Sequence, residues 1–394
     1  MQYTLTSGEV HAQTTTLLRT ALRLSDYKQT CPVPTLLGVV YVACARLVSI
    51  SAAAAGLLYG PCAETIRKAL LAQFGEIDEL QRRFNLAFRY GLPSNRDRRR
   101  RKYWLAVDLT LIPYHGKPQK AENELYRGQP KGGTTHFHAY ASLCIVETGQ
   151  RFTVALRYVR HKEKMAAVVK ALLRTAAEVR IRPRKLLLDR GFYAVDVVCY
   201  LKRAGYPFVM PVPMKGRRPN HPKGPGGTRV FGTWKRSGYS RYRLHSTGKQ
   251  GEWVEIGVHC RNRAGRRGKH GRERLVYAFW GFTPPKRVKD LSEQYRRRFG
   301  IETSYRQMHQ ARARTSTRNP LVRLFLVGVA LVLRNVWVWL TGLGQAANQK
   351  SRRRLARSKL TLKQMLHWLQ LLVEETFGVI TELQTEHPTK PIVM

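Results

Sequence analysis

The sequence predicts an α/β fold in which helices flank a mixed β-sheet. Three strand-like runs follow one another between residues 103 and 159, and helices then alternate with strands between residues 163 and 212. The segment before residue 91 shows helical patterns only. Consecutive strands followed by helix-linked strands build one sheet with antiparallel and parallel pairs. We therefore expect an N-terminal helical domain followed by an α/β core.

The N-terminal segment contains a pair of short helical runs with a tight turn between them. Residues 51–58 and 63–74 flank the turn Tyr59-Gly60-Pro61, and the second run carries Arg67. This arrangement resembles a helix-turn-helix, whose second helix can enter the major groove of DNA. Alanine-rich helix pairs also occur simply as packing units, so both interpretations stay open for this segment.

The core begins with a strand that carries an acid at its centre. The run Tyr103–Ile112 alternates in polarity, with Asp108 between apolar neighbours. A buried carboxylate is costly unless it is paired or binds a cation. A short apolar strand, 185–188, ends on a second acid, Asp189. The other expected core elements are strands 136–146 and 152–159, helix 163–179, helix 193–204 and strand 207–212.

This order of elements is that of the ribonuclease H-like fold, and the two acids lie where an open α/β sheet commonly binds ligands. Beyond the core, the pattern predicts a small antiparallel insertion and then three helices. The expected strands of the insertion are 229–235, 241–246, 252–261 and 274–282. The expected helices are one long helix 289–311, a buried helix 321–343 and an amphipathic helix 361–375.

These elements divide the chain into five predicted segments. They are a helical N-terminal domain 1–97, a first part of the catalytic core 98–214, a β-rich insertion 215–286, a second core part 287–345 and a basic helical tail 346–394. The basic run within 91–102 lies close to the first of these boundaries.

The charge of the chain favours a polyanionic partner. Lys and Arg number 70 against 25 Asp and Glu, which gives a formal charge of +45. A hydrophobic fraction of 43% and seven tryptophans argue against a disordered basic tail. The six cysteines have no CxxC spacing, which predicts reduced thiols in a cytosolic protein. The N-terminus shows no signal pattern, and Arg323 and Arg334 interrupt the apolar run, so we expect no membrane partner.

A third acid, Glu302, lies alone in an arginine-rich stretch, with no other carboxylate between Glu293 and Glu374. Carboxylates that converge from strand ends and a helix can hold two Mg²⁺ ions about 4 Å apart, and these ions drive phosphodiester chemistry. On one helix, Tyr295, Arg298, Glu302 and His309 would share a face. The alternative is a core tyrosine beside an ordinary ion pair between Arg298 and Glu302.

The motifs around these acids together resemble a known family. Tyr295-x2-Arg298-x3-Glu302 resembles the Tyr-Arg-Glu-Lys signature of the insertion-sequence-four type of DDE transposases, and LLLDRGFY and AVDLTLIPYHG resemble the two earlier acidic motifs of that group. The signature lysine falls on His309, which departs from the family pattern. In such relatives an insertion aromatic stacks on a flipped base. Trp234, Trp253 and Trp280 are the candidates here, although each is expected in the core.

The resemblance implies a catalytic, metal-binding triad of Asp108, Asp189 and Glu302. It further implies Mg²⁺ as the cofactor, in two ions and with Mn²⁺ as a substitute, and cut-and-paste transposition as the activity. The candidate DNA contacts are Tyr295, Arg298, Arg306, His309, Arg190 and Arg67.

The implied partners are the terminal inverted repeats of an element and target DNA, bound by a homodimer in the cytoplasm of a prokaryote. The alternatives are a structure-specific nuclease of the same fold and a DNA-binding protein derived from a transposase that has lost catalysis. A basic RNA-binding protein is disfavoured, because it does not explain where the acids lie.

Overall fold

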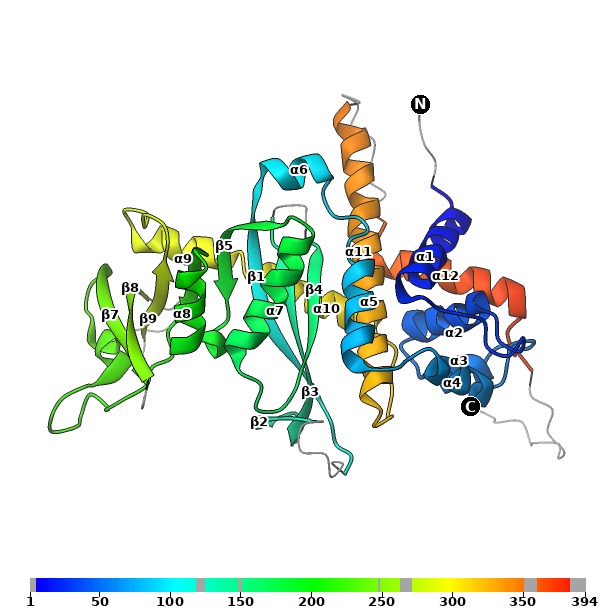
Figure 1. Cartoon of the computed structure of the whole chain (residues 1–394), viewed down its shortest axis with the longest axis horizontal. Coiled ribbons are helices and arrows are strands. Elements are labelled where there is room, and N and C mark those ends of the chain that lie inside the picture. Colours follow the sequence, from blue (N-terminus) through cyan, green and yellow to red (C-terminus); the bar gives the residue numbers. More distant parts are fainter. Residues whose placement is uncertain are drawn as a thin grey trace, which may run out of the picture. The chain divides into compact units, whose positions relative to one another are not determined.

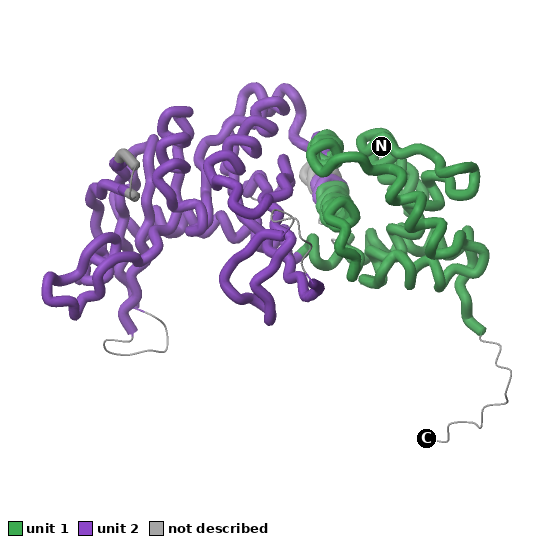
Figure 2. The backbone as a smooth tube through the Cα atoms, turned by 60° about the horizontal axis from the view of Figure 1, so that its bottom comes forward, with its two compact units in different colours: residues 1–87, 307–337, 351–394 green, residues 88–306, 338–350 purple. Residues whose placement is uncertain are grey.

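The computed structural model describes residues 5–117, 125–147, 151–246, 249–262, 271–350 and 360–382. The backbone forms two compact units, coloured separately in Figure 2. Unit 1 combines residues 1–87, 307–337 and 351–394, and unit 2 combines residues 88–306 and 338–350. The five predicted sequence segments stay predictions. They divide the chain along its sequence, whereas the two units group residues that pack together in space.

Unit 1 is built from helices, as the N-terminal pattern predicts. These are α1 (Ser7–Leu22), α2 (Val33–Arg46), α3 (Ile50–Ala55), α4 (Ala63–Ala72), α5 (Ile77–Ala87), α12 (Leu362–Phe377) and most of α11 (Pro320–Lys350). The helix α1 begins in a capping box, in which Thr6 and Glu9 each bond the backbone N–H of the other. The predicted pair of short helices is present as α3 and α4, and its role in DNA binding stays a prediction.

The helix α11 explains the long apolar run near residue 330. Residues 320–342 are long and apolar enough to cross a bilayer, but 89% of the apolar window is buried inside the protein. A helix that is apolar on all sides belongs either in a protein core or in a membrane. Burial to this extent is typical of a core helix, which is what the sequence predicts for this run. Even Arg334 is fully buried, and its Nε donates to the side chain of Gln307.

Unit 2 is organised on one mixed sheet of nine strands in the order β2-β3-β1-β5-β6-β9-β8-β7, with β4 on β3. The first strands are β1 (Lys102–Pro113), β2 (Tyr126–Lys131), β3 (Thr134–Ile145) and β4 (Thr153–Val159). The later strands are β5 (Arg182–Leu188), β6 (Phe208–Pro211), β7 (Gly238–Ser246), β8 (Lys249–Asn262) and β9 (Arg272–Trp280). β1, β5 and β6 run parallel, whereas β3 is antiparallel to β1, so the predicted mixed sheet is confirmed.

The two faces of the sheet have different neighbours, and strand alternation assigns each residue to one of them. Leu105 and Val107 of β1 join the main apolar core, together with residues of α7 (Met165–Glu178) and α8 (Val195–Arg203). Asp108 therefore points to the opposite face. Figure 1 shows α7 and α8 in front of the sheet and α10 behind it. A further short helix of unit 2 is α6 (Asn95–Arg100).

The insertion differs from its prediction in three ways. Its strands β7, β8 and β9 are antiparallel but extend the main sheet, because β9 pairs with β6. The predicted strand 229–235 is wrong: Gly227–Thr233 forms a 3₁₀ helix, fixed by Thr228 Oγ1, which donates to Pro213 and accepts from the N–H of Lys215. Trp253, expected in the core, is 50% exposed.

The predicted long helix 289–311 is two helices, α9 (Val288–Arg296) and α10 (Phe299–Ala311). At the break, the N–H of Arg298 bonds the carbonyl of Tyr295, and the N–H of Gly300 bonds that of Arg297. These i to i−3 bonds tighten the turn and interrupt the α-helical screw. The expectation that Tyr295, Arg298, Glu302 and His309 share one continuous helical face is therefore wrong.

Candidate active site

The three predicted acids come from two neighbouring strands and one helix. Asp108 lies within β1, and Asp189 follows directly after the last residue of β5. The parallel pairing of the two strands aligns Val107 with Leu188, so each acid is the next residue in register. Glu302 lies in the first turn of α10, where a carboxylate is favoured by the helix dipole.

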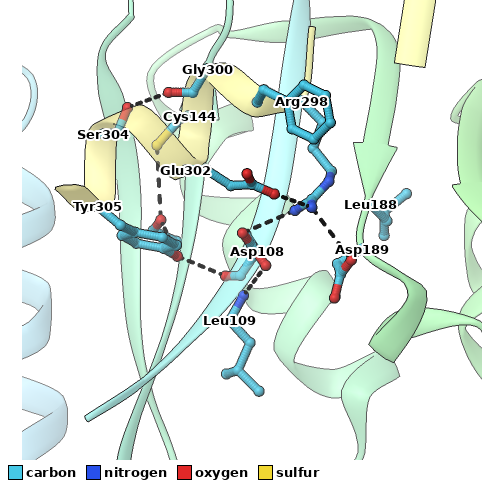
Figure 3. A network of polar contacts seen from close by, with 12 residues as sticks. Asp108, Leu109, Cys144, Leu188, Asp189, Arg298, Gly300, Glu302, Ser304 and Tyr305 are labelled. Atoms are coloured by element: carbon cyan, nitrogen blue, oxygen red, sulfur yellow. Dashed lines mark hydrogen bonds and ion pairs between the residues drawn. The ribbon is translucent and has the colours of Figure 1, made fainter. Parts of the chain in front are cut away.

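One guanidinium group joins all three acids (Figure 3). The Nη1 atom of Arg298 lies 3.0 Å from Asp108 Oδ2, and its Nη2 atom lies 2.5 Å from Glu302 Oε1 and 3.5 Å from Asp189 Oδ1. The carboxylates that the sequence assigns to one site thus meet around one positive charge. The tight turn before α10 places Arg298 there, since its backbone lies between the two helices.

Burial differs within the group and sets its electrostatics. The side chain of Asp108 is 12% exposed, whereas those of Asp189 and Glu302 are 42% and 45% exposed. Burial raises the pKa of Asp108 to about 6, although the charge of Arg298 acts in the opposite direction. Burial alone lowers the pKa of Arg298, but the Tyr295 hydroxyl and the three carboxylates outweigh it and the net pKa is raised. The site is therefore closed at Asp108 and open at the other two acids.

Asp108→Asn is expected to stabilise the fold at neutral pH. Because the folded pKa of Asp108 is about 6 against an ordinary 3.8, ionising it costs about 2–3 kcal/mol more in the folded chain. Asparagine removes that cost, so the free energy of unfolding at pH 7 should rise by up to this amount. This gain in the free energy of unfolding should decrease as the pH is lowered from 6 to 4, and it should vanish below pH 4. Urea unfolding of both proteins across this range measures it, and a loss of stability at pH 7 would contradict it.

Tyr305 fixes the helix against the strand that carries Asp108. Its hydroxyl donates to the backbone carbonyl of Asp108 at 2.9 Å and lies 2.8 Å from Ser142 Oγ. Ser142 is the register partner of Asp108 on β3. The sequence reasoning missed Tyr305, although it lies three residues after Glu302 and seven after Arg298, at helical spacing. It positions the catalytic candidates without touching their carboxylates.

Tyr295 has a similar supporting position. It is buried, and its hydroxyl donates to the backbone carbonyl of Leu188 at 3.1 Å, directly before Asp189. Burial also raises the pKa of its hydroxyl. The geometry therefore gives the Tyr295 hydroxyl a partner inside the protein, where the sequence resemblance implies a contact with DNA.

Tyr295→Phe is expected to lower the free energy of unfolding by about 1–2 kcal/mol, because the buried carbonyl of Leu188 loses a donor. The salt dependence of DNA binding should not change, since the hydroxyl is used internally. Denaturant unfolding and DNA titrations at several salt concentrations measure the two effects. A variant of unchanged stability that binds DNA more weakly would instead show that the hydroxyl contacts DNA.

The other candidate DNA contacts lie at different places. Arg190 is exposed directly after Asp189, and Arg306 is exposed one helical turn after Glu302. His309 is exposed on the same helix, within unit 1. Arg67 also belongs to unit 1, where it is exposed and pairs with Glu64 at 2.7 Å. Only Arg190 and Arg306 adjoin the acids within unit 2.

The donor set of the site is made of oxygen atoms only. Three carboxylates without histidine or cysteine are the ligand type that hard divalent cations prefer. Among the described residues, however, no group of three or more His, Cys, Asp or Glu already has the geometry to hold a metal ion. The acids are arranged around the guanidinium instead. The Nε of Arg298 is buried with no hydrogen-bond partner in the described part of the chain.

Comparisons with known proteins agree with this architecture. A family model described as a transposase DDE domain matches residues 99–334, more than half of the chain. No curated protein matches the sequence. A cryo-EM structure of the piggyBac transposase synaptic complex with hairpin DNA aligns with a TM-score of 0.50 and 11% identity, covering 100% of this chain and 80% of that chain. At this identity the likeness concerns the fold, and it confirms the ribonuclease H-like core.

Proposed function

Because the chain belongs to the transposase DDE domain family, we propose that it is a DNA transposase that binds the ends of its element and catalyses metal-dependent cleavage and strand transfer. The observation that carries the proposal is the meeting of Asp108, Asp189 and Glu302 around one cationic group. An ordinary surface ion pair would need one carboxylate, whereas this site brings three together from distant parts of the sequence.

The three carboxylates would hold Mg²⁺, with Mn²⁺ as a substitute. Their oxygen chemistry fits such an ion, and their common orientation toward a positive charge supports a cation site. When bound, two such ions activate the attacking oxygen and stabilise the leaving oxygen of a phosphodiester. Since Arg298 occupies the centre of the acids, metal binding would involve a shift of its guanidinium toward the substrate phosphate.

The protein supplies orientation around that chemistry. The N–H of Leu109 donates to Asp108 Oδ1 at 2.8 Å, which fixes one oxygen of this acid. Tyr305 holds the backbone of Asp108 against α10, and Tyr295 holds the end of β5 in front of Asp189. These bonds fix the backbone at Asp108 and Asp189, so the rearrangement on metal binding would be confined to the carboxylate side chains and Arg298. Arg190, directly after Asp189, and Arg306, one helical turn after Glu302, are exposed and would contact phosphates of the bound strand.

Double-stranded DNA is the proposed partner, both as element ends and as target. The formal charge of +45 supports a polyanionic ligand. The structural neighbour is itself a transposase synaptic complex with hairpin DNA. A homodimer that pairs two ends and a cytoplasmic location in a prokaryotic cell belong to the same proposal, and both rest on the family resemblance.

The test is a strand-transfer assay on the protein with Mg²⁺, a linear DNA that carries the terminal sequences flanking its gene, and a target plasmid. The proposal expects cut ends that are joined to the target. Ends that are cut but never joined would identify a nuclease instead. DNA binding that is equal with Mg²⁺ and with EDTA, without any cutting, would identify a DNA-binding protein that has lost catalysis.

A further inference from the structure

A basic pocket beside the break between α9 and α10 has no role in the site described above. Its volume is about 170 Å³, and it is lined by residues of unit 2 that include Glu147, Arg151, Arg296, Arg297 and Gly300. We propose that this pocket binds one backbone phosphate of the DNA, at a position outside the phosphodiester that the acids cut. The proposal rests on the proposed transposase function.

The charge of the pocket fits an anion. Three arginines line it against a single carboxylate, that of Glu147. This carboxylate is already engaged, since its Oε1 accepts from the N–H of Trp104 at 3.0 Å and its Oε2 lies 4.0 Å from Arg297 Nη1. Neither Arg151 nor Arg296 has an ion-pair partner among the described residues. Two positive charges are thus left for a ligand.

One of the three arginines, Arg297, is held in place before any ligand binds. The guanidinium of Arg297 lies over the ring of Trp104 at 4.7 Å, and Glu147 holds it from a second side. A guanidinium over an aromatic ring keeps the N–H donors in its own plane free for other partners. Such a group can give planar, bidentate hydrogen bonds to phosphate oxygens at a lower entropic cost than a mobile lysine.

The pocket is also large enough for a phosphate group. Its volume of about 170 Å³ far exceeds the roughly 10–15 Å³ that a single water needs. Gly300 contributes to this space, because a Cβ there would lie 3.2 Å from Val146 Cγ1 and 3.3 Å from Arg151 Nε. A larger side chain at this position would press on the arginine, so the absence of a side chain keeps the wall open.

The chain connects the pocket directly to the acids. Arg296 and Arg297 line the pocket, and the next residue, Arg298, joins the three carboxylates. Gly300 and Thr303 line the pocket on either side of Glu302 in the sequence of α10. With about 3.6 residues per turn, Gly300 and Thr303 face a different side of α10 from Glu302, so a phosphate held in the pocket would belong to a nucleotide away from the bond that is cut. Such a contact would fix the register of the strand without reading its sequence.

The experiment measures how DNA affinity depends on salt, without any cutting. The full-length protein is titrated with a mixed-sequence 30-base-pair duplex in EDTA at several salt concentrations. Arg151→Gln/Arg296→Gln is expected to lower the slope of log affinity against log salt by about 0.9, the effect of one phosphate contact. Arg174→Gln, which changes an exposed arginine on α7, serves as the matched control and should leave the slope unchanged, because α7 covers the face of the sheet opposite Asp108.

A double-mutant cycle identifies the shared ligand. If Arg151 and Arg296 hold one phosphate, the effects of the two single substitutions are not additive, whereas those of Arg151 and Arg174 add. An unchanged slope in the double variant would overturn the proposal.

A titration with inorganic phosphate is a second experiment. If phosphate binding depends on Arg151 and Arg296 while the DNA slope is unchanged, the pocket takes free phosphate and the DNA assignment is wrong. Neither result depends on strand transfer, so failure of the pocket and failure of the transposase function are distinguishable.

Discussion

Asp189→Asn is expected to lower strand transfer by about 10³-fold or more while leaving the fold intact. Metal ions contribute several kcal/mol to the stabilisation of charge in the transition state, and each 1.36 kcal/mol is a factor of ten in rate. Asparagine keeps the shape of the side chain but removes a charged oxygen ligand. Because the Asp189 side chain is 42% exposed, its neutralisation should change stability little. Glu302→Gln is expected to behave in the same way, since that side chain is 45% exposed.

The strand-transfer assay measures these variants against a matched control. Glu293→Gln is suitable, because Glu293 is an exposed acid on α9 that pairs with Lys289 only at 3.9 Å. It should retain full activity. Equal DNA affinity of all the proteins in EDTA would show that the loss arises in the chemical step. Full activity of either triad variant would remove that residue from the metal site.

Arg298→Gln is expected to lower the free energy of unfolding by about 3–5 kcal/mol at pH 7.5, the typical cost of removing one partner of a buried ion pair. The guanidinium is buried, with a 9% exposed side chain, and it neutralises Asp108, which is also buried. Without it, three carboxylates face one another with no counter-charge. Glutamine keeps most of the length of the side chain, so the loss reflects the missing charge more than a cavity.

Two controls separate this electrostatic cause from a packing defect. Protonation of Asp108 relieves the unpaired charge. Because Arg298 lowers the pKa of Asp108, this pKa should lie above about 6 in the variant, and the loss should shrink as the pH falls through that higher value. Mg²⁺ should also restore stability in Arg298→Gln more than in the parent protein, because a bound ion stabilises the folded state by mass action. Thermal unfolding with and without Mg²⁺ measures this. A loss that is independent of both pH and Mg²⁺ would show that Arg298 acts by packing.

The sequence predicts the placement of the acids because strand order follows from local patterns. The alternation around Asp108 and the apolar run before Asp189 each identify a strand, and the element order of the ribonuclease H-like fold then makes the two strands neighbours, as their parallel pairing confirms. Glu302 stands out by its isolation among basic residues. The convergence of these three acids therefore needs little information beyond the chain itself.

The position of Arg298 between the three acids could not be predicted in the same way. The break between α9 and α10 depends on a few i to i−3 bonds, and no proline marks it in the sequence. Helical periodicity continues through the break, so pattern reading joins the two helices into one. Only the folded backbone shows that Tyr295 turns toward Leu188 while Arg298 turns toward the acids.

The insertion shows a second limit of sequence reading. Its strands are visible in the sequence, but the pairing of β9 with β6 joins distant segments, and local patterns do not specify such pairs. The short strand Tyr126–Lys131 was missed, since it is mostly exposed and lies in a Gly- and Lys-rich stretch. The exposure of Trp253 likewise depends on which face of β8 is covered.

The most direct test of the central claim is a Mn²⁺ titration of the DNA-bound protein, followed by electron paramagnetic resonance. The claim is that Asp108, Asp189 and Glu302 together bind the metal ion of the reaction. It predicts that the parent protein and Glu293→Gln bind Mn²⁺ equally, and that Asp189→Asn and Glu302→Gln each lose most of this binding while still holding DNA. Mn²⁺ binding that is unchanged in both triad variants would contradict the claim.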